Sequence, residues 1–275
     1  MPLLAAVLPI FNEQSRIVKT LTYYASRLTC PLYIVDAGSS DQTLAICNDF
    51  TKIYTCGLFI LHHKNSGTTE SQEWIDWLLG EMPHNYFIFF SCSELISPQS
   101  LELFSRSISL GHDLVYVNRK SFSLGRDVSA VYSKPIDIAF GKYSYFPLCR
   151  FASRHALSSI PTYIHDNWLS SARSVNAYFA YDKSCFVSHY KNPDLTANLL
   201  KHISYAKEDA EKCPRLFIVV LRVFREIAYI LYFALTFRLN ANLLLELLMR
   251  LGYHANMAIF IIFNAYLRDK SMSAM

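Results

Sequence analysis

Apolar runs alternate with helical patterns along the first 100 residues of the chain. Four runs predict buried strands, at residues 3–10, 31–36, 58–63 and 86–90. Between these runs, apolar positions recur at helical spacing and predict three helices, at residues 13–28, 41–50 and 68–82. Strands that are apolar on both faces and alternate with helices are typical of a parallel sheet covered by helices. We therefore predict an α/β fold.

The rest of the chain falls into two parts with different patterns. Residues 101–190 contain short strands and many Tyr, Phe and Ser residues, and a polar helix is predicted over residues 194–212. Two strongly apolar helical segments then follow, at residues 215–239 and 241–270. We predict one domain over residues 1–212, which consists of two halves at 1–97 and 98–212. An amphipathic helical appendage is predicted over residues 213–275.

The net positive charge lies in the most hydrophobic part of the chain. Residues 215–270 carry seven Lys or Arg against three acids, which accounts for the whole net charge of +4. This pattern differs from a basic stripe on a polar face, so we expect no nucleic-acid partner. Residues 216–237 are long enough to span a bilayer, but Arg222, Arg225 and Glu226 near their middle argue against spanning. The pattern favours helices that lie on a membrane surface, and packing on the domain or in a homo-oligomer is the alternative.

The cysteine pattern and the N-terminus bear on the compartment. The seven cysteines are odd in number, scattered and without a C-x-x-C pair, which indicates a reducing compartment and argues against a zinc knuckle. The apolar N-terminal stretch is short and reaches an acid at Glu13, so it favours a first strand over a signal peptide. We expect a cytoplasmic protein that is peripheral at the inner membrane face.

Three polar clusters follow predicted strands, at residues 9–13, 36–41 and 91–94. Ligands bind at the carboxyl ends of the strands in open α/β sheets, so side chains at these positions are candidates for a binding site. A carboxylate there accepts from a base N–H or a ribose hydroxyl, and a Gly-Ser turn allows close approach. Each cluster alone is also consistent with a plain turn and helix cap, and the order and spacing of the three carry the inference.

The stretches LPIFNEQ and VDAGSSDQT, with their spacing, resemble the opening of the inverting family-two glycosyltransferases. The similarity is specific over residues 3–50, recognisable to Glu94, and continues in islands to about residue 212. Enzymes that extend lipopolysaccharide core or other surface glycans are the most similar group. The resemblance implies a GT-A fold, a Rossmann-like, mostly parallel sheet, and a UDP-sugar donor.

The resemblance also implies roles for residues at the first two strand ends. Pro9, Phe11, Asn12 and Glu13 would line the pocket for the base and ribose. Asp36 would bind the edge of the base. Gly38 and Ser39 would complete the nucleotide-sugar site, with Ser39 and Asp41 also holding the loop.

The third cluster departs from the family pattern. The family has Asp-X-Asp-Glu here, and its acids hold a divalent cation on the diphosphate, whereas this chain has Ser91 and Ser93 in the Asp positions and keeps only Glu94. Hydroxyls replace carboxylates poorly as ligands for Mg²⁺ or Mn²⁺. Three readings stay open. Glu94, with His189, holds the metal weakly; or basic residues such as Lys142, Arg150 and Lys191 neutralise the diphosphate without metal; or transfer activity is lost.

Further islands of resemblance point to the acceptor side of the reaction. The segment IPTYIHDN resembles the family's His-Glu motif, so Asp166 is the candidate base that takes the proton of the acceptor hydroxyl. A helix N-cap is the alternative role for Asp166. His165, Arg150 and Lys191 would contact the acceptor or the diphosphate.

Together these features predict an inverting hexosyltransferase that acts on a lipid-linked or surface glycan. The first alternative is a catalytically impaired scaffold that binds nucleotide-sugar or glycan. The second is a nucleotidyltransferase, which the absence of a Gly-rich basic loop after the first strand disfavours.

Overall fold

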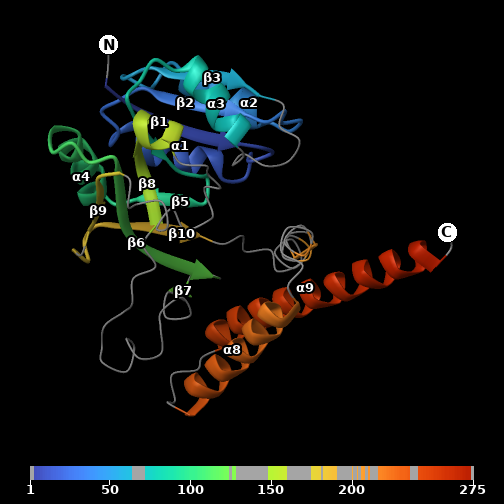
Figure 1. Cartoon of the computed structure of the whole chain (residues 1–275). Coiled ribbons are helices and arrows are strands. Elements are labelled where there is room, and N and C mark those ends of the chain that lie inside the picture. Colours follow the sequence, from blue (N-terminus) through green and yellow to red (C-terminus); the bar gives the residue numbers. More distant parts are fainter. Residues whose placement is uncertain are drawn as a thin grey trace. The chain divides into compact units, whose positions relative to one another are not determined.

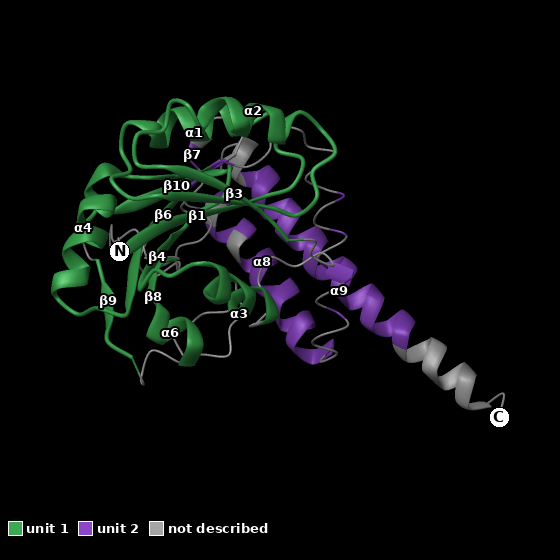
Figure 2. Cartoon of the chain, turned by 90° about the horizontal axis from the view of Figure 1, so that it is seen from above, with its two compact units in different colours: residues 1–120, 145–189 green, residues 121–144, 190–275 purple. Residues whose placement is uncertain are grey.

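The computed structural model divides the chain into two compact units. Unit 1 comprises residues 1–120 and 145–189, and unit 2 comprises residues 121–144 and 190–275 (Figure 2). The structure describes residues 3–63, 72–123, 126–127, 148–159, 175–180, 182–190, 200, 203, 206–207, 210, 216–235 and 241–273. The boundary between residues 212 and 213, and the halves of the domain before it, stay a prediction.

Unit 1 is built on one mixed sheet (Figure 1). Its strand order is β3-β2-β1-β4-β8-β6-β10-β5, and β9 pairs with β6. The strands are β1 (Leu4–Ile10), β2 (Leu32–Asp36), β3 (Leu58–His62), β4 (Tyr86–Phe89), β5 (Glu94–Ile96), β6 (Leu114–Ser123), β8 (Leu148–Ser153), β9 (Ala177–Phe179) and β10 (Phe186–Tyr190). The strands β1 to β4 pair in parallel, and β8 then runs antiparallel to both β4 and β6. The α/β class is therefore confirmed, with the parallel half formed by the four predicted strands.

Helices cover both faces of this sheet (Figure 2). They are α1 (Ile17–Ala25), α2 (Thr43–Phe50), α3 (Gln72–Glu81), α4 (Pro98–Ser109) and α6 (Arg154–Ser159). Alternate residues of β1 point to opposite faces: Leu8 packs in the core with α1, α2 and α4, and Val7 packs in the core with α3 and α6. Both side chains are fully buried. This double burial explains why the strand reads as one continuous apolar run.

Unit 2 contains two long helices, α8 (Leu216–Leu235) and α9 (Ala241–Ser273), and the short strand β7 (Arg126–Asp127), which pairs with the end of β6. The helices α8 and α9 lie side by side (Figure 1). Glu226 is fully buried and accepts from Arg225 Nη2 at 2.7 Å and Arg250 Nη2 at 2.8 Å. Two of the three charges that stand mid-helix in the sequence, Arg225 and Glu226, thus pair within the unit. Within the described part of the chain, one stretch, Leu244–Asn264 of α9, has the length and apolar composition to cross a membrane.

Candidate active site

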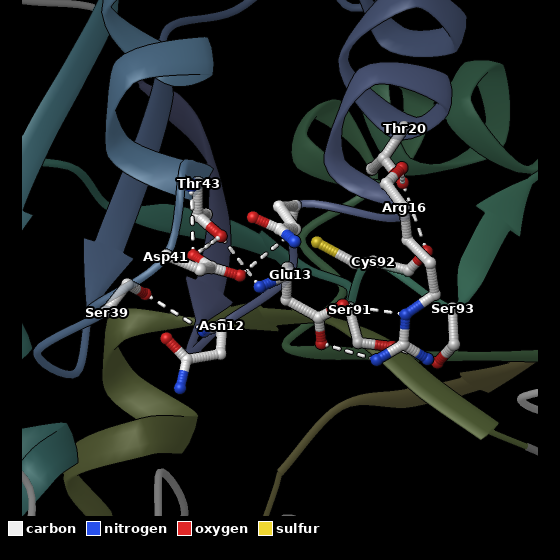
Figure 3. A network of polar contacts seen from close by, with 11 residues as sticks. Asn12, Glu13, Arg16, Thr20, Ser39, Asp41, Thr43, Ser91, Cys92 and Ser93 are labelled. Atoms are coloured by element: carbon white, nitrogen blue, oxygen red, sulfur yellow. Dashed lines mark hydrogen bonds and ion pairs between the residues drawn. The ribbon is translucent and has the colours of Figure 1, made fainter.

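The parallel pairing brings the three predicted clusters to one edge of the sheet. Strand β1 lies between β2 and β4, with Ile10 opposite Asp36 and Val7 opposite Phe89. Carboxyl ends of parallel strands meet at the same edge, so residues 11–13, 36–41 and 91–94 lie near one another. Figure 3 shows side chains from all three clusters within one polar network. The convergence predicted from the sequence is present in the structure.

Asn12 connects the end of β1 to the loop after β2. Its backbone has φ 52°, in the left-handed region that Asn adopts more readily than most residues. Its N–H donates to Ser39 Oγ at 3.0 Å, and its Oδ1 accepts from the Ser40 N–H at 2.9 Å (Figure 3). These bonds cross 27 and 28 residues of sequence and hold the two loops together.

Asp41 performs the loop-holding role that the sequence predicted for it. Its carboxylate accepts from the Gln14 N–H at 3.2 Å and from the Thr43 N–H at 3.0 Å, and the Thr43 hydroxyl also donates to it. Some desolvation opposes ionisation, but these hydrogen bonds lower the pKa of Asp41. Thr43 Oγ1 in turn accepts from the Glu13 N–H at 2.8 Å, which ties the end of β1 to the start of α2.

The Asp36 carboxylate turns into the loop that follows it. Its side chain is 2% exposed and accepts from Gly38 N–H at 3.1 Å and Ser39 N–H at 3.0 Å. Gly38 has φ 97°, which a side chain would strain, so glycine is required for this turn. Phe11 is 58% exposed at the end of β1, and Pro9 is half-buried below it. An exposed aromatic ring beside this rigid loop suits stacking of a flat heterocycle, and the base-binding roles of these residues stay predictions.

The turn that replaces the family's acidic motif is closed on itself. Ser91 Oγ and Ser93 Oγ lie 2.7 Å apart and bond to each other. The Glu94 N–H donates to Ser91 O at 2.9 Å, and Ser91 N–H donates to Glu94 Oε2 at 3.1 Å. The carbonyl of Cys92 accepts from Thr20 Oγ1 at 3.0 Å, which fixes the turn on α1 (Figure 3). The turn's one acid, Glu94, is buried.

Glu94, the one acid that remains, is bound by Arg150. Arg150 Nη2 donates to Glu94 Oε1 at 2.5 Å and Nε donates to Oε2 at 3.1 Å, and the Glu94 residue is 2% exposed. Burial alone would raise the pKa of Glu94, but the Arg150 guanidinium overcomes it and, helped by His189 and Arg119, lowers that pKa to about 2. The ion pair is bidentate, which fixes the orientation of both side chains.

The divalent cation of the family therefore does not fit the described side chains. Ser91 and Ser93 offer only hydroxyls that bond to each other, and both oxygens of Glu94 already accept from Arg150. His189 of β10 lies opposite Glu94 of β5 in the antiparallel register of these two strands. Among the residues that the structure describes, no group of three or more His, Cys, Asp or Glu side chains is arranged to hold a metal.

Arg16, which the sequence reasoning did not select, lies in the same network. Its Nε and Nη2 donate to the two carboxylate oxygens of Glu13, both at 2.7 Å, and its side chain is 35% exposed. Figure 3 shows the guanidinium beside the turn of Ser91, Cys92 and Ser93. The i, i+3 spacing of Glu13 and Arg16 in the sequence was the available signal.

Four predicted site residues lie outside the described residues: Lys142, His165, Asp166 and Lys191. The described part of the site combines an exposed ring, a rigid loop and a basic surround at Ser91–Glu94. It therefore suits a ligand that joins a flat heterocycle to an anionic group.

Comparison with known proteins gives a family match and a fold match. The sequence profile of glycosyl transferase family 2 matches residues 5–179. No curated protein sequence matches the chain.

Among solved structures, the mannosyltransferase PcManGT from Pyrobaculum calidifontis, in complex with GDP-Man and Mn²⁺, has a TM-score of 0.51 and 12% identity; the match covers 99% of this chain and 80% of that one. S. aureus TarS has a TM-score of 0.48 and 14% identity, over 78% of this chain and 43% of that one. TarS 1–349 in complex with UDP has a TM-score of 0.44 and 16% identity, and the match covers 69% of this chain and 61% of that one. The chain thus spans less than two thirds of either TarS chain. At these identities the likeness concerns the fold alone.

Proposed function

Because the chain belongs to glycosyl transferase family 2, we propose that it moves a sugar from a nucleotide-diphospho-sugar to a glycan hydroxyl. The proposed donor is a UDP-hexose, and the acceptor is a lipid-linked or surface glycan of the lipopolysaccharide type. Transfer proceeds with inversion in a single displacement.

One observation carries the proposal: the ends of β1, β2 and β4 meet at one edge of the sheet, and hydrogen bonds join the loops after β1 and β2 into a preorganised pair. Asn12, Ser39 and Asp41 make hydrogen bonds that fix this pair before any ligand binds. A preorganised loop pair and an exposed Phe11 ring lower the ordering penalty of binding a nucleotide. Such a site suits the base and ribose of the donor, with Pro9 and Glu13 as further lining residues.

The chemical step follows from the motif around Asp166. In the proposed reaction the acceptor oxygen attacks the anomeric carbon, the bond from that carbon to the diphosphate breaks, and Asp166 takes the acceptor's proton. The nucleoside diphosphate leaves with the bonding electrons, so positive charge near its oxygens stabilises the transition state. His165, Arg150 and Lys191 are proposed to position the acceptor or the diphosphate. No step is assigned to a metal ion.

The C-terminal helices are proposed to attach the protein to the inner face of a cell membrane. Large apolar side chains of α8 are exposed, with Phe217 at 74%, Phe224 at 64% and Leu235 at 78%. Anionic headgroups complement the excess of Lys and Arg over residues 215–270. A lipid-linked acceptor would be presented at the same surface.

Release of UDP from a panel of UDP-hexoses tests the proposal. Wild-type protein is expected to release UDP in the presence of a glycan acceptor, and Asp166→Asn is expected to lose about 10²–10⁴-fold in rate while still binding UDP. Equal rates for the two proteins would refute the role of Asp166. Absence of nucleotide binding in both would refute the proposed function.

A catalytically impaired scaffold is the second candidate. The observation that favours it is the pairing of Ser91 with Ser93 where the family keeps acids. Tight UDP binding without any sugar transfer, across the donor panel and a broad set of acceptors, would select the scaffold.

A further inference from the structure

Basic side chains surround the turn where the family places acids. Arg150 is bonded to Glu94, and both His189 and Arg119 act electrostatically on the same carboxylate. Arg16 acts in the same way on Cys92, in the middle of the turn. Three bases therefore act on the one acid of the turn, Glu94, while Glu13 and Arg16 act on Cys92 with opposite sign. The acids that the family pattern places at positions 91 and 93 are absent.

Arg16 retains hydrogen-bonding capacity toward solvent. A guanidinium has five N–H donors, and two of the nitrogens of Arg16 bond to Glu13. In the described part of the chain, no hydrogen bond is formed by its Nη1, and 35% of the side chain is exposed. Glu13 holds the guanidinium in a fixed orientation, which reduces the entropy lost when it binds an anion.

The serines of the turn preserve this charge. Carboxylates at positions 91 and 93 would stand beside the guanidinium of Arg16 and neutralise it (Figure 3). The hydroxyls of Ser91 and Ser93 bond to each other at 2.7 Å and carry no charge. The same substitution that removes the metal ligands thus leaves an arginine available to an anion.

We propose that Arg16 binds the diphosphate of the donor directly, in place of a divalent cation. The inference rests on the proposed function, because it concerns the donor of that reaction. The planar guanidinium fork matches two phosphate oxygens, and at this edge of the sheet it stabilises the leaving diphosphate as charge develops.

Calorimetric titration with UDP and with GDP, in EDTA and then in Mn²⁺, tests the inference without any turnover. We expect the Kd for the preferred nucleotide to be equal in EDTA and in Mn²⁺. Arg16→Gln should weaken binding about 10- to 100-fold, since it removes a charge-assisted contact to phosphate. Arg16→Lys keeps the charge but loses the planar fork of N–H donors. Its Kd should therefore lie between those of wild type and Arg16→Gln.

Arg106→Gln is the matched control, because Arg106 also pairs with a glutamate close to it in the sequence, Glu102, at 3.9 Å, but on the surface of α4. Its Kd should equal that of wild type. The double variant Ser91→Asp with Ser93→Asp should weaken binding in EDTA, because two carboxylates would neutralise Arg16 and repel the diphosphate. Circular dichroism checks that each variant is folded.

The outcomes separate the two proposals. Binding that needs Mn²⁺, or a Kd of Arg16→Gln equal to that of Arg106→Gln, overturns the inference and leaves the proposed function standing. Absence of binding for both nucleotides under both conditions overturns both.

Discussion

Replacement of Glu94 by Gln tests the buried ion pair on which the site is built. The substitution preserves the shape of the side chain but removes its charge, and Arg150, 8% exposed, is left without a counter-ion. The Ser91 N–H also loses a charged acceptor at 3.1 Å. The perturbation is therefore electrostatic and is confined to the contacts of one carboxylate.

The structure sets the size of the expected effect in two ways. The difference between the ordinary pKa of 4.5 for this carboxyl and its folded value of about 2 corresponds to about 3 kcal/mol. Removal of one partner of a buried pair typically destabilises by about 3–5 kcal/mol. We therefore expect Glu94→Gln to lower the free energy of unfolding of unit 1 by about 3–5 kcal/mol at pH 7.

Urea denaturation followed by tryptophan fluorescence measures this loss, since Trp74 and Trp77 both lie in α3 of unit 1. The pKa of Glu94 is lower in the folded state, so its stabilisation is complete above pH 4.5 and is lost as the pH falls toward 2. The difference between wild type and Glu94→Gln should therefore shrink when the titration is repeated near pH 3. Glu102→Gln, which breaks an exposed pair on α4, is the control and should change stability by less than about 1 kcal/mol.

Two results would refute this reasoning. The first is a loss for Glu94→Gln no larger than that for Glu102→Gln, which would mean that the pair contributes nothing. The second is stabilisation of wild type, but not of Glu94→Gln, by Mn²⁺, which would make Glu94 a metal ligand.

Two further predictions concern the loops at the ends of β1 and β2. Asn12→Val should lower the free energy of unfolding by about 1–3 kcal/mol, because a β-branched residue is strained at φ 52° and the bond from the Ser40 N–H to the Asn12 side chain is lost; Asn12→Gly, which relieves the strain but still lacks this bond, should recover part of the loss in the same urea assay. Asp41→Ala should lower the thermal midpoint at pH 7, because hydrogen bonds to the carboxylate lower its folded pKa; the difference from wild type should shrink as the pH falls below the ordinary pKa of 3.8 and through the lower folded pKa, and a pH-independent difference in thermal melts would contradict the loop-holding role.

Much of the fold could be predicted from the sequence because burial follows local pattern. The runs that became β1 to β4 are apolar on both faces, and only a sheet covered on both sides buries such runs. The edge of the sheet that carries the site was also predictable, since parallel strands with helical connections end on the same side. The loop-holding role of Asp41 was predictable as well, because an acid placed just before a helix can accept from the first backbone N–H groups of that helix.

The contacts that decide the chemistry depend on register between distant strands, which no local pattern encodes. Arg150 reaches Glu94 across 56 residues because β8 pairs with β4, and this contact turns an expected metal ligand into half of a buried ion pair. Likewise, Arg250 lies 24 residues from Glu226 and pairs with it only because α8 and α9 pack together. Hydrophobic periodicity thus determined which residues are buried and where the strands end. Tertiary packing decided which charges meet there, since an ion pair depends on the distance between two side chains in space.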